Sequence, residues 1–556
     1  MLQPNYEPFS SVSFQHKQRT SPYPMAKDDD RQSHFPMFKD PLPASSSQPP
    51  PVFHAPPTSS LGFLPSLKRK RRRWCPRRYG FIALSVIVLL LLAYRHTVAV
   101  YYAFLRIKLN QTLLESGYLP CGIVRKDPML YVLDGHQVQL VWEMNCDMND
   151  MQIAWRPLTT STPAGNSSND PWTWTKASPI QLAPHHVLYR AILDLNEKTA
   201  TRYRYHIYSA NNIDKPVRQY DFTWRQHDRS QPLRFAAIAD NQFGLRNFLR
   251  ILSHVPGYRP DYLIHAGDAV QQYPSLQQWQ TDFVAPLTYH GLGQHAPMIY
   301  AHGNHDHDPT FAYHYTRSSH GQPWHAFSMA DGAIRFIVLD SNLDWQQQDE
   351  WLNRELSSDA CQQAAFRVVV VHIPPFLEYW DPKAWFEGKE SEWGRFVRER
   401  YVPLFEQHGV DLVISGHQHN YERGQHNGIM YAIIGGAGGD IDVERVQDFG
   451  MYDAHHLDFH FVLLDLLPLP NNEHHQADGS DNDHQPWELV WRAFDKHGKM
   501  IDTHRQRSRS RPSYFPLENM HNPEDNQVGA VSPDVIQDVT LMDLDDSEAA
   551  LNDDAK

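Results

Sequence analysis

The stretch Gly416-His417-Gln418-His419-Asn420-Tyr421-Glu422-Arg423 decides how this chain is interpreted. It follows an apolar run, residues 411–415, and carries two imidazoles separated by one residue. Imidazole nitrogens are common ligands of transition metals. A Gly-His pair after a strand is more often a simple turn, so the stretch gains its meaning only from similar strings elsewhere in the chain.

Four earlier strings have the same form, with polar residues directly after a short apolar run. They are Asp240-Asn241-Gln242, Gly267-Asp268, Gly303-Asn304-His305-Asp306 and His372, and they follow the runs 234–239, 262–265, 298–300 and 367–371. Two divalent cations that share one carboxylate need such a set of carboxylates, imidazoles and one neutral amide. The five strings together therefore predict one metal centre.

The apolar runs before these strings predict the fold class. Runs that are apolar on both faces, separated by helical or loop stretches, are typical of strands in a sheet covered by helices. Ligands at the carboxyl ends of such strands share one edge of the sheet. We therefore expect an α/β domain that gathers residues scattered along the sequence.

In this order the strings resemble the motifs of the calcineurin-like metallophosphoesterases, which read D-x-H or D-x-G, GD, GNH followed by Glu or Asp, H, and GHxH. The continuation Tyr421-Glu422-Arg423 and the glycine-rich segment 433–439 are most similar to the purple acid phosphatase branch. The resemblance covers about 230–505. It implies a β-sandwich flanked by helices (αββα) over 232–505 and a hydrolase that cleaves phosphomonoesters or phosphodiesters.

The resemblance also implies a role for each residue of the strings. The implied ligands are Asp240, Asp268 and His419 for a first divalent cation, and Asp268, Asn304, His372 and His417 for a second. Asp268 would bridge the two ions, which we expect to be zinc, manganese or iron, and a hydroxide between them would attack phosphorus in line. His305 would be the catalytic residue that protonates the leaving group.

Two positions depart from the family pattern. Gln242 stands where the family has His or Gly, and Gln271 stands where the purple branch has the tyrosinate that binds ferric iron. A glutamine offers only a neutral carbonyl oxygen, so we expect a looser first metal site and a colourless protein. Gln242, Gln271 and Asp306 are weaker candidates as ligands or as supports for ligands.

The composition bounds what surrounds this centre. The chain has 556 residues, of which 41% are apolar, so it can bury the cores of two or three domains. The formal net charge of -13 argues against general nucleic-acid binding.

The first hundred residues predict attachment to a membrane. Residues 1–67 are rich in Pro, Ser and Gln and should form a disordered cytoplasmic arm. The basic segment 68–78 precedes an apolar stretch, 79–105, that Arg95 and His96 interrupt. We interpret it as a signal-anchor transmembrane helix with the catalytic domain lumenal or extracellular; a buried core helix is the alternative.

Residues 118–226 show the alternating pattern of strands and predict an all-β sandwich of fibronectin or immunoglobulin type. Cys121 and Cys146 both fall in this region and are the expected disulfide. Asn110 and Asn166 begin glycosylation triplets. Residues 506–556 should be a disordered tail.

Three functions follow from these observations. We expect a membrane-anchored phosphohydrolase whose partners are a phosphate ester and the membrane. A catalytically weakened relative that binds phosphorylated ligands or glycans is one alternative, motivated by Gln242 and Gln271. A structural membrane protein, in which the strings merely end strands, is the other.

Overall fold

The computed structural model describes residues 76–158, 171–195, 201–209, 212–308, 312–316, 322–342, 346–379, 386–387, 390–470 and 485–509. The predicted disordered arm (1–67), residues 68–75 of the basic segment, the tail from 510 and Asn166 lie outside these residues. The described residues from Arg77 onward belong to one compact unit.

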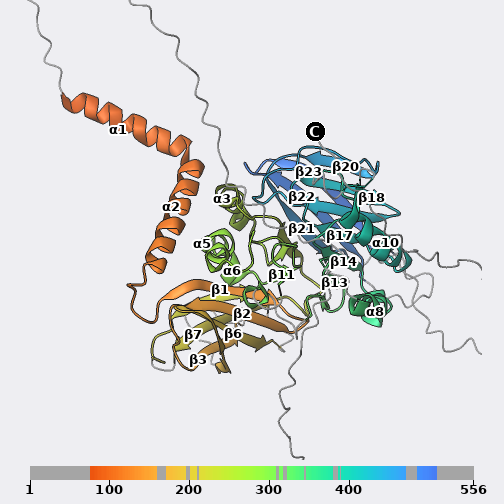
Figure 1. Cartoon of the computed structure of the whole chain (residues 1–556), viewed down its shortest axis with the longest axis horizontal. Coiled ribbons are helices and arrows are strands. Elements are labelled where there is room, and N and C mark those ends of the chain that lie inside the picture. The colour runs from red at the N-terminus through yellow and green to blue at the C-terminus, as the bar shows by residue number, and fades with distance from the viewer. Residues whose placement is uncertain are drawn as a thin grey trace, which may run out of the picture. The chain divides into compact units, whose positions relative to one another are not determined.

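Two large β-sheets form the centre of this unit (Figure 1). The first contains, in spatial order, β23 (Met500–Arg507), β22 (Trp487–Asp495), β21 (His460–Pro468), β9 (Leu233–Ile238), β10 (Tyr262–His265), β11 (Met298–Tyr300), β1 (Val124–Val132), β2 (Gln137–Met144), β6 (His186–Asp194) and β5 (Ser178–Ala183). The second contains β12 (His325–Met329), β13 (Ile334–Leu339), β14 (Phe366–Val371), β17 (Leu412–Ser415), β19 (Ile429–Ile434), β18 (Tyr421–His426) and β20 (Tyr452–His456).

The strands that precede the five strings are parallel within each sheet. β9, β10 and β11 pair in parallel, as do β14 and β17, where Val368 is opposite Leu412. Every residue of β10, β14 and β17 is buried, which is the pattern of parallel strands covered on both faces. The carboxyl ends of these strands therefore carry the predicted ligands.

The main core lies between the two sheets. It joins Phe235 and Ile264 of the first sheet to Phe336, Val368 and Ile414 of the second. The rings of Phe235 and Phe336 are 5.3 Å apart between centroids. Side chains from both sheets thus close one dry interior.

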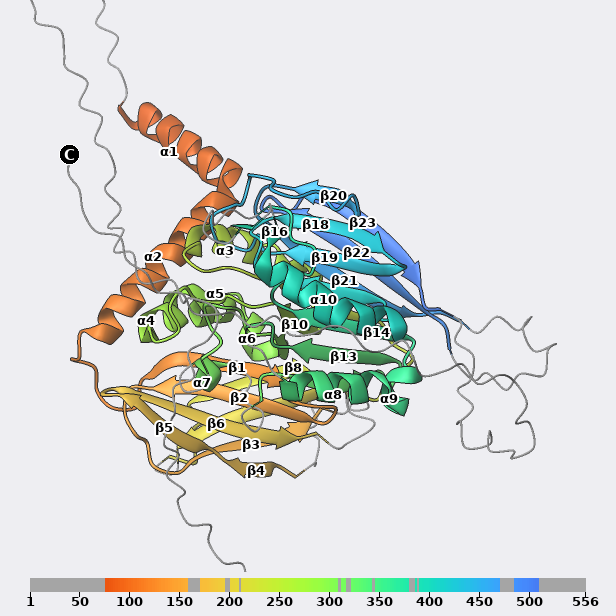
Figure 2. The ribbon, with the colours of Figure 1, turned by 45° about the vertical axis from the view of Figure 1, so that its right-hand side comes forward.

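Helices cover the outer faces of both sheets, which gives a mixed α/β fold of four layers (Figure 2). The first sheet is covered by α3 (Leu245–Leu252), η1 (Val255–Tyr258), α4 (Leu276–Gln278), η2 (Trp279–Val284), α5 (Ala285–Tyr289), α6 (Leu292–His295) and α7 (Ala312–Tyr315). The second is covered by α8 (Gln346–Leu356), α9 (Asp359–Gln362) and α10 (Glu392–Gln407). The short strands β15 (Phe386–Glu387) and β16 (Glu390–Ser391) precede α10.

The region 118–226 supplies strands to two sheets. β3 (Met151–Pro157), β4 (Thr173–Lys176), β7 (Arg202–Ser209) and β8 (Arg218–Thr223) form a separate four-stranded sheet. In contrast, β1 pairs in parallel with β11, where Tyr131 is opposite Met298. The all-β region and the catalytic region therefore share one continuous sheet, a pairing that the strand pattern alone does not specify.

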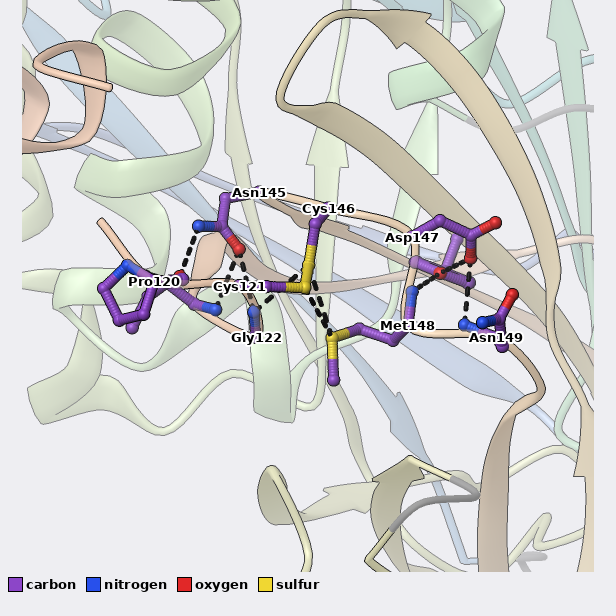
Figure 3. The surroundings of a disulfide bond; sticks show 10 residues. Pro120, Cys121, Gly122, Asn145, Cys146, Asp147, Met148 and Asn149 are labelled. Carbon is purple, nitrogen blue, oxygen red and sulfur yellow. Dashed lines mark hydrogen bonds between the residues drawn. A yellow bond between two sulfur atoms is a disulfide. The ribbon is translucent and has the colours of Figure 1, made fainter. Parts of the chain in front are cut away.

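A disulfide joins Cys121 to Cys146 at the start of this region, with their Cα atoms 5.5 Å apart (Figure 3). The Asn145 side chain accepts hydrogen bonds from the backbone N–H groups of Gly122 and Ile123 and donates one to the Pro120 carbonyl. These bonds hold the two ends of the bridge together.

The apolar segment expected as one helix over 79–105 is instead two helices, α1 (Pro76–Ala93) and α2 (Arg95–Glu115). Among the described residues, no single helix has both the length and the apolar character needed to cross a membrane; the pair Leu84–Ala93 and Arg95–Glu115 has them together and is bent by 83°. The bend falls at Tyr94, where the charged and polar pair Arg95 and His96 begins. Asn110 is exposed on α2.

Candidate metal centre

The loops after the five strands bring the predicted ligands together. Asp268, His372 and His417 place one ligand atom each within 4.8 Å of one another, and all three are buried. They follow β10, β14 and β17, so two sheets contribute to one site. Residues that are far apart in the sequence therefore meet where the edges of the two sheets face each other.

Asn304 is at the centre of this group. Its side-chain oxygen Oδ1 lies 3.0 Å from Nε2 of His372 and 2.9 Å from Nδ1 of His417. His372 Nε2 is also 3.5 Å from Asp268 Oδ2. A carboxylate, an amide oxygen and two imidazole nitrogens therefore converge, which is a donor set suited to a divalent transition metal.

Asp240 and His419 form a second group beside the first. His419 Nε2 lies 3.6 Å from Asp240 Oδ1. The Gln242 amide nitrogen lies 3.3 Å from Asp268 Oδ2 and 3.3 Å from His419 Nε2, so this side chain reaches between the two groups. Gln242 Oε1 is buried and has no hydrogen-bond partner among the described residues. Rotation of the amide by half a turn would direct this oxygen toward the same two ligands.

Three of the candidate ligands have a strained backbone. Asp240, Asp268 and His417 all have positive φ angles, of 60°, 56° and 68°. Non-glycine residues rarely adopt this conformation, and it costs about 1–3 kcal/mol where it occurs. Three such residues in one site indicate that the surrounding fold, and not local backbone preference, fixes the orientation of these side chains.

Two glycines leave room for the carboxylates. A Cβ atom on Gly303 would lie 2.0 Å from Asp268 Oδ1, and a Cβ atom on Gly416 would lie 2.5 Å from Asp240 Oδ2. The glycines of the Gly-Asn-His and Gly-His motifs are therefore required by close approach to the ligands.

Backbone carbonyls fix two of the imidazoles. His372 Nδ1 is bonded to the Ala266 carbonyl at 2.8 Å, and His419 Nδ1 to the Asp440 carbonyl at 2.7 Å. A carbonyl accepts only from a protonated nitrogen, so Nε2 of each ring is left to face the site.

Asp442 also holds His419, because its Oδ2 accepts the His419 backbone N–H at 2.7 Å. Neither Asp440 nor Asp442 was among the predicted site residues. Their position shortly after the glycine-rich segment 433–439 was the only available signal.

His305 stands at the edge of the site and is half-buried. Its backbone N–H donates to Asp268 Oδ1 at 2.9 Å, and its Nδ1 is bonded to the Gln271 carbonyl at 3.0 Å. The ring therefore presents Nε2 as its remaining nitrogen. Gln271 accepts this hydrogen bond through its backbone carbonyl and not through its side chain.

Asp306 holds two loops of the site together. Its carboxylate accepts hydrogen bonds from the N–H groups of Gly303 and Ala269 and from the Tyr300 hydroxyl, at 2.6, 2.7 and 2.5 Å. It thus ties the loop that carries Asp268 to the loop that carries Asn304. Burial, together with the charge of Asp268, raises the pKa of Asp306 to about 6.

The charges in the site fit a cation. Burial, together with the charge of Asp268, raises the pKa of Asp240 well above its usual range. Burial alone would lower the pKa of His372, but the Asp268 carboxylate outweighs it and raises this pKa to about 10. Two buried carboxylates and a ring that holds a proton between them are the arrangement that a bound divalent cation would relieve.

Comparison with known proteins agrees with this geometry. The sequence model of the calcineurin-like phosphoesterase family matches residues 233–421. The chain is 26% identical over 195 residues to the human serine/threonine-protein phosphatase CPPED1, covering 32% of this chain and 60% of that protein. It is 24% identical over 262 residues to purple acid phosphatase 5 of Arabidopsis thaliana, covering 45% of this chain and 58% of that protein.

The fold is also similar to that of a solved protein. Purple acid phosphatase PPD1 from yellow lupin (Lupinus luteus) seeds superposes with a TM-score of 0.53 at 17% sequence identity, over 68% of this chain and 73% of that one. The chain spans less than two thirds of the length of the two curated relatives named above.

Proposed function

Because residues 233–421 form a calcineurin-like phosphoesterase domain, we propose that this chain is a dinuclear metal-dependent phosphohydrolase that cleaves phosphomonoesters or phosphodiesters. The observation that carries the proposal is the convergence of Asp268, Asn304, His372 and His417 on one point. Asp240 and His419 beside it supply the donors for a second cation.

Each residue of the site has a definite task in this reaction. Bound cations would supply Lewis-acid activation of water and neutralisation of phosphoryl charge. Asp268 faces both groups of donors, since His372 lies near its Oδ2 and Gln242 reaches the same oxygen. His305 is held by the Gln271 carbonyl so that Nε2 can donate a proton to the departing alkoxide.

Metal content and turnover test the proposal together. We expect the full-length protein, purified with manganese, zinc or iron, to hydrolyse p-nitrophenyl phosphate or bis-p-nitrophenyl phosphate. Asp268→Asn and His417→Ala should lose both bound metal and turnover. Asp331→Asn, an exposed position outside the site, is the matched control and should keep both. A wild-type protein that holds no metal after loading would refute the proposal.

A weakened enzyme is the second candidate, and Gln242 favours it. The neutral amide of Gln242 lies beside His419, where some members of the family have an imidazole, and it is a weaker donor for a cation in the group around Asp240. In that case mass spectrometry would find one metal per chain and turnover would be slow, while phosphorylated ligands still bound.

We extend the proposal to membrane attachment. The apolar part of α1, residues 79–93, rises about 22 Å, short of the roughly 30 Å of a hydrocarbon core, and α2 continues the apolar stretch beyond the bend. The side chains of α1 from Leu84 to Leu92 include none that packs in a core, and the large apolar ones are between 45% and 65% exposed. A disulfide between Cys121 and Cys146 suits an oxidising compartment.

The basic segment 68–78 then marks the cytoplasmic side, and the catalytic domain is lumenal or extracellular. Protease treatment of sealed microsomes tests this orientation. We expect a C-terminal epitope tag to be protected and an N-terminal tag to be digested; the reverse pattern would overturn the topology.

A further inference from the structure

Helix α2 is apolar on two opposite faces. On one face Val100, Ala103 and Ile107 are buried against Leu245 and Leu249 of α3. The other face carries a second apolar row whose members are three or four residues apart and 43% to 65% exposed: Val98, Tyr102, Leu105, Leu109 and Leu113. This spacing places them in one stripe along the helix. A helix that is already docked on the protein therefore presents apolar side chains outward.

The bend at Tyr94 would place this apolar stripe against a membrane surface. The two helical segments meet at 83°, nearly a right angle. If α1 stands in a bilayer, α2 runs almost parallel to the membrane plane. Amphipathic helices in that orientation bury an apolar face in the lipid interface and keep basic residues at the headgroups. Arg106 and Lys108 are exposed on the flanks of α2; the Arg106 guanidinium lies over the Tyr289 ring, 5.5 Å from its centroid, and Lys108 faces the start of α3.

A cavity of about 570 Å³ lies between α2 and the start of α3. Its apolar walls include Tyr101 and Phe104 of α2 and Phe243 from the loop before α3. Its basic walls are Lys108 and Arg246, both exposed. Asp282, the acidic residue in the lining, is buried and accepts a hydrogen bond from the Thr281 hydroxyl.

Phe243 lines this cavity and is the neighbour in sequence of a residue of the candidate metal centre. It directly follows Gln242, whose amide is 3.3 Å from both Asp268 Oδ2 and His419 Nε2. Phe243 is 66% exposed and has a φ of 61°, a rare combination for a large apolar residue. Together with Tyr101 and Phe104 of α2, it gives the cavity an aromatic wall that could pack against an apolar ligand.

We infer that the substrate is a phosphate ester borne by a membrane lipid. The inference rests on the proposed phosphohydrolase function and specifies its substrate class. The lipid chain would lie in the cavity between α2 and Phe243, Lys108 and Arg246 would attract the phosphate, and the ester would reach the metal centre past Gln242. For a monoester, water adds to phosphorus, the bond from phosphorus to the lipid oxygen breaks, and the lipid alcohol takes the proton as inorganic phosphate leaves.

Chain-length dependence tests this inference on the full-length, metal-loaded protein in nanodiscs. The probes are dioleoyl and dihexanoyl phosphatidic acid, with the matched phosphatidylglycerols for the diester case and p-nitrophenyl phosphate as the soluble reference. We expect kcat/KM to be at least about tenfold higher for the long-chain lipid than for the short-chain one, since a six-carbon chain leaves much of the aromatic wall formed by Tyr101, Phe104 and Phe243 uncovered.

Variants of the cavity wall should change this selectivity. Phe243→Ser and Phe104→Ser should lower the ratio of long-chain to short-chain kcat/KM by about tenfold. Ile213→Ser, at an exposed apolar residue of the all-β region, is the matched control and should leave the ratio unchanged. A general structural defect would lower both rates and leave the ratio intact.

A second readout does not depend on turnover. In the Asp268→Asn variant, a photoactivatable phosphatidic acid should cross-link to peptides of α2 and of the loop 243–247. Equal rates for both chain lengths, or cross-links confined to other peptides, would overturn the lipid inference while p-nitrophenyl phosphate hydrolysis still supported the phosphohydrolase. Failure of the wild type on every ester, with metal bound, would overturn both.

Discussion

The side-chain amide of Gln242 lies 3.3 Å from Nε2 of His419, inside the group of donors around Asp240. An imidazole at position 242 would offer a stronger donor than the amide at the same place. We expect Gln242→His to raise the affinity for manganese or zinc at the weaker site by about tenfold or more. Equilibrium dialysis followed by metal analysis measures this.

The control for that variant is Gln272→His, which adds an imidazole at an exposed position outside the site. It should leave the affinity unchanged. If Gln242→His bound metal no more tightly than the wild type, Gln242 would not occupy a ligand position.

His305 should matter most for poor leaving groups. Its Nδ1 is engaged by the Gln271 carbonyl, so Nε2 is the nitrogen available to protonate the leaving oxygen. We expect His305→Gln to slow hydrolysis of an alkyl phosphate by about 10²-fold and that of p-nitrophenyl phosphate much less, with unchanged metal content. His307→Gln is the control: the Nδ1 atom of His307 is bonded to the Asn304 carbonyl, and this variant should not show the selective loss on the alkyl phosphate. An equal loss on both esters would argue for a positioning role.

The clustering of the candidate ligands was predictable from the sequence because they follow buried strands. The order of Asp240, Asp268, Asn304, His372 and His417 placed each at a strand end, and parallel strands end at one edge. The residues and backbone features that support these ligands became visible only in the structure. Asp442 holds His419 from a loop with no regular pattern, and the positive φ of Asp268 leaves no mark in the sequence.

The bend between α1 and α2 and the sheet shared by the all-β and catalytic regions could not be predicted, because both depend on contacts between distant segments. The sequence 79–105 is apolar enough for one helix, but Val100 and Ile107 gain more by packing on α3. Likewise β1 adds to β11 through a long-range register that no local propensity encodes. Strand and helix patterns set the elements, whereas contacts between distant segments set their partners.

Gly303 should be essential for metal binding. A Cβ atom there would lie 2.0 Å from Asp268 Oδ1 and 2.4 Å from the Asp268 backbone nitrogen, so the Asp268 carboxylate must move. We expect Gly303→Ala to abolish stoichiometric metal binding, as measured by mass spectrometry of the loaded protein. Gly257→Ala is the control, because no atom lies within 4 Å of a Cβ added there. Normal metal content in Gly303→Ala would show that this loop can shift without loss of the site.

Glu143 should stabilise the junction of the all-β and catalytic regions in a pH-dependent way. Its fully buried carboxylate contacts Lys126 Nζ at 2.5 Å, His186 Nδ1 at 2.7 Å and the Tyr315 hydroxyl at 3.0 Å. Burial alone would raise the pKa of Glu143, but Lys126 and His186 outweigh it and lower this pKa to about 2 from a usual 4.5. Because the folded-state pKa is depressed, the stabilisation is complete above about pH 4.5 and is lost as the pH falls toward 2.

We therefore expect Glu143→Gln to lower the free energy of unfolding by about 3–5 kcal/mol at pH 7, since it leaves the buried Lys126 without its counter-charge. The difference from the wild type should shrink between about pH 4.5 and pH 2. Denaturant titrations across this range measure it. Glu488→Gln, which removes a surface pair with the largely exposed Arg505, is the control and should cost at most about 1 kcal/mol. A difference that stayed constant down to pH 3 would mean that folding does not lower the pKa of Glu143.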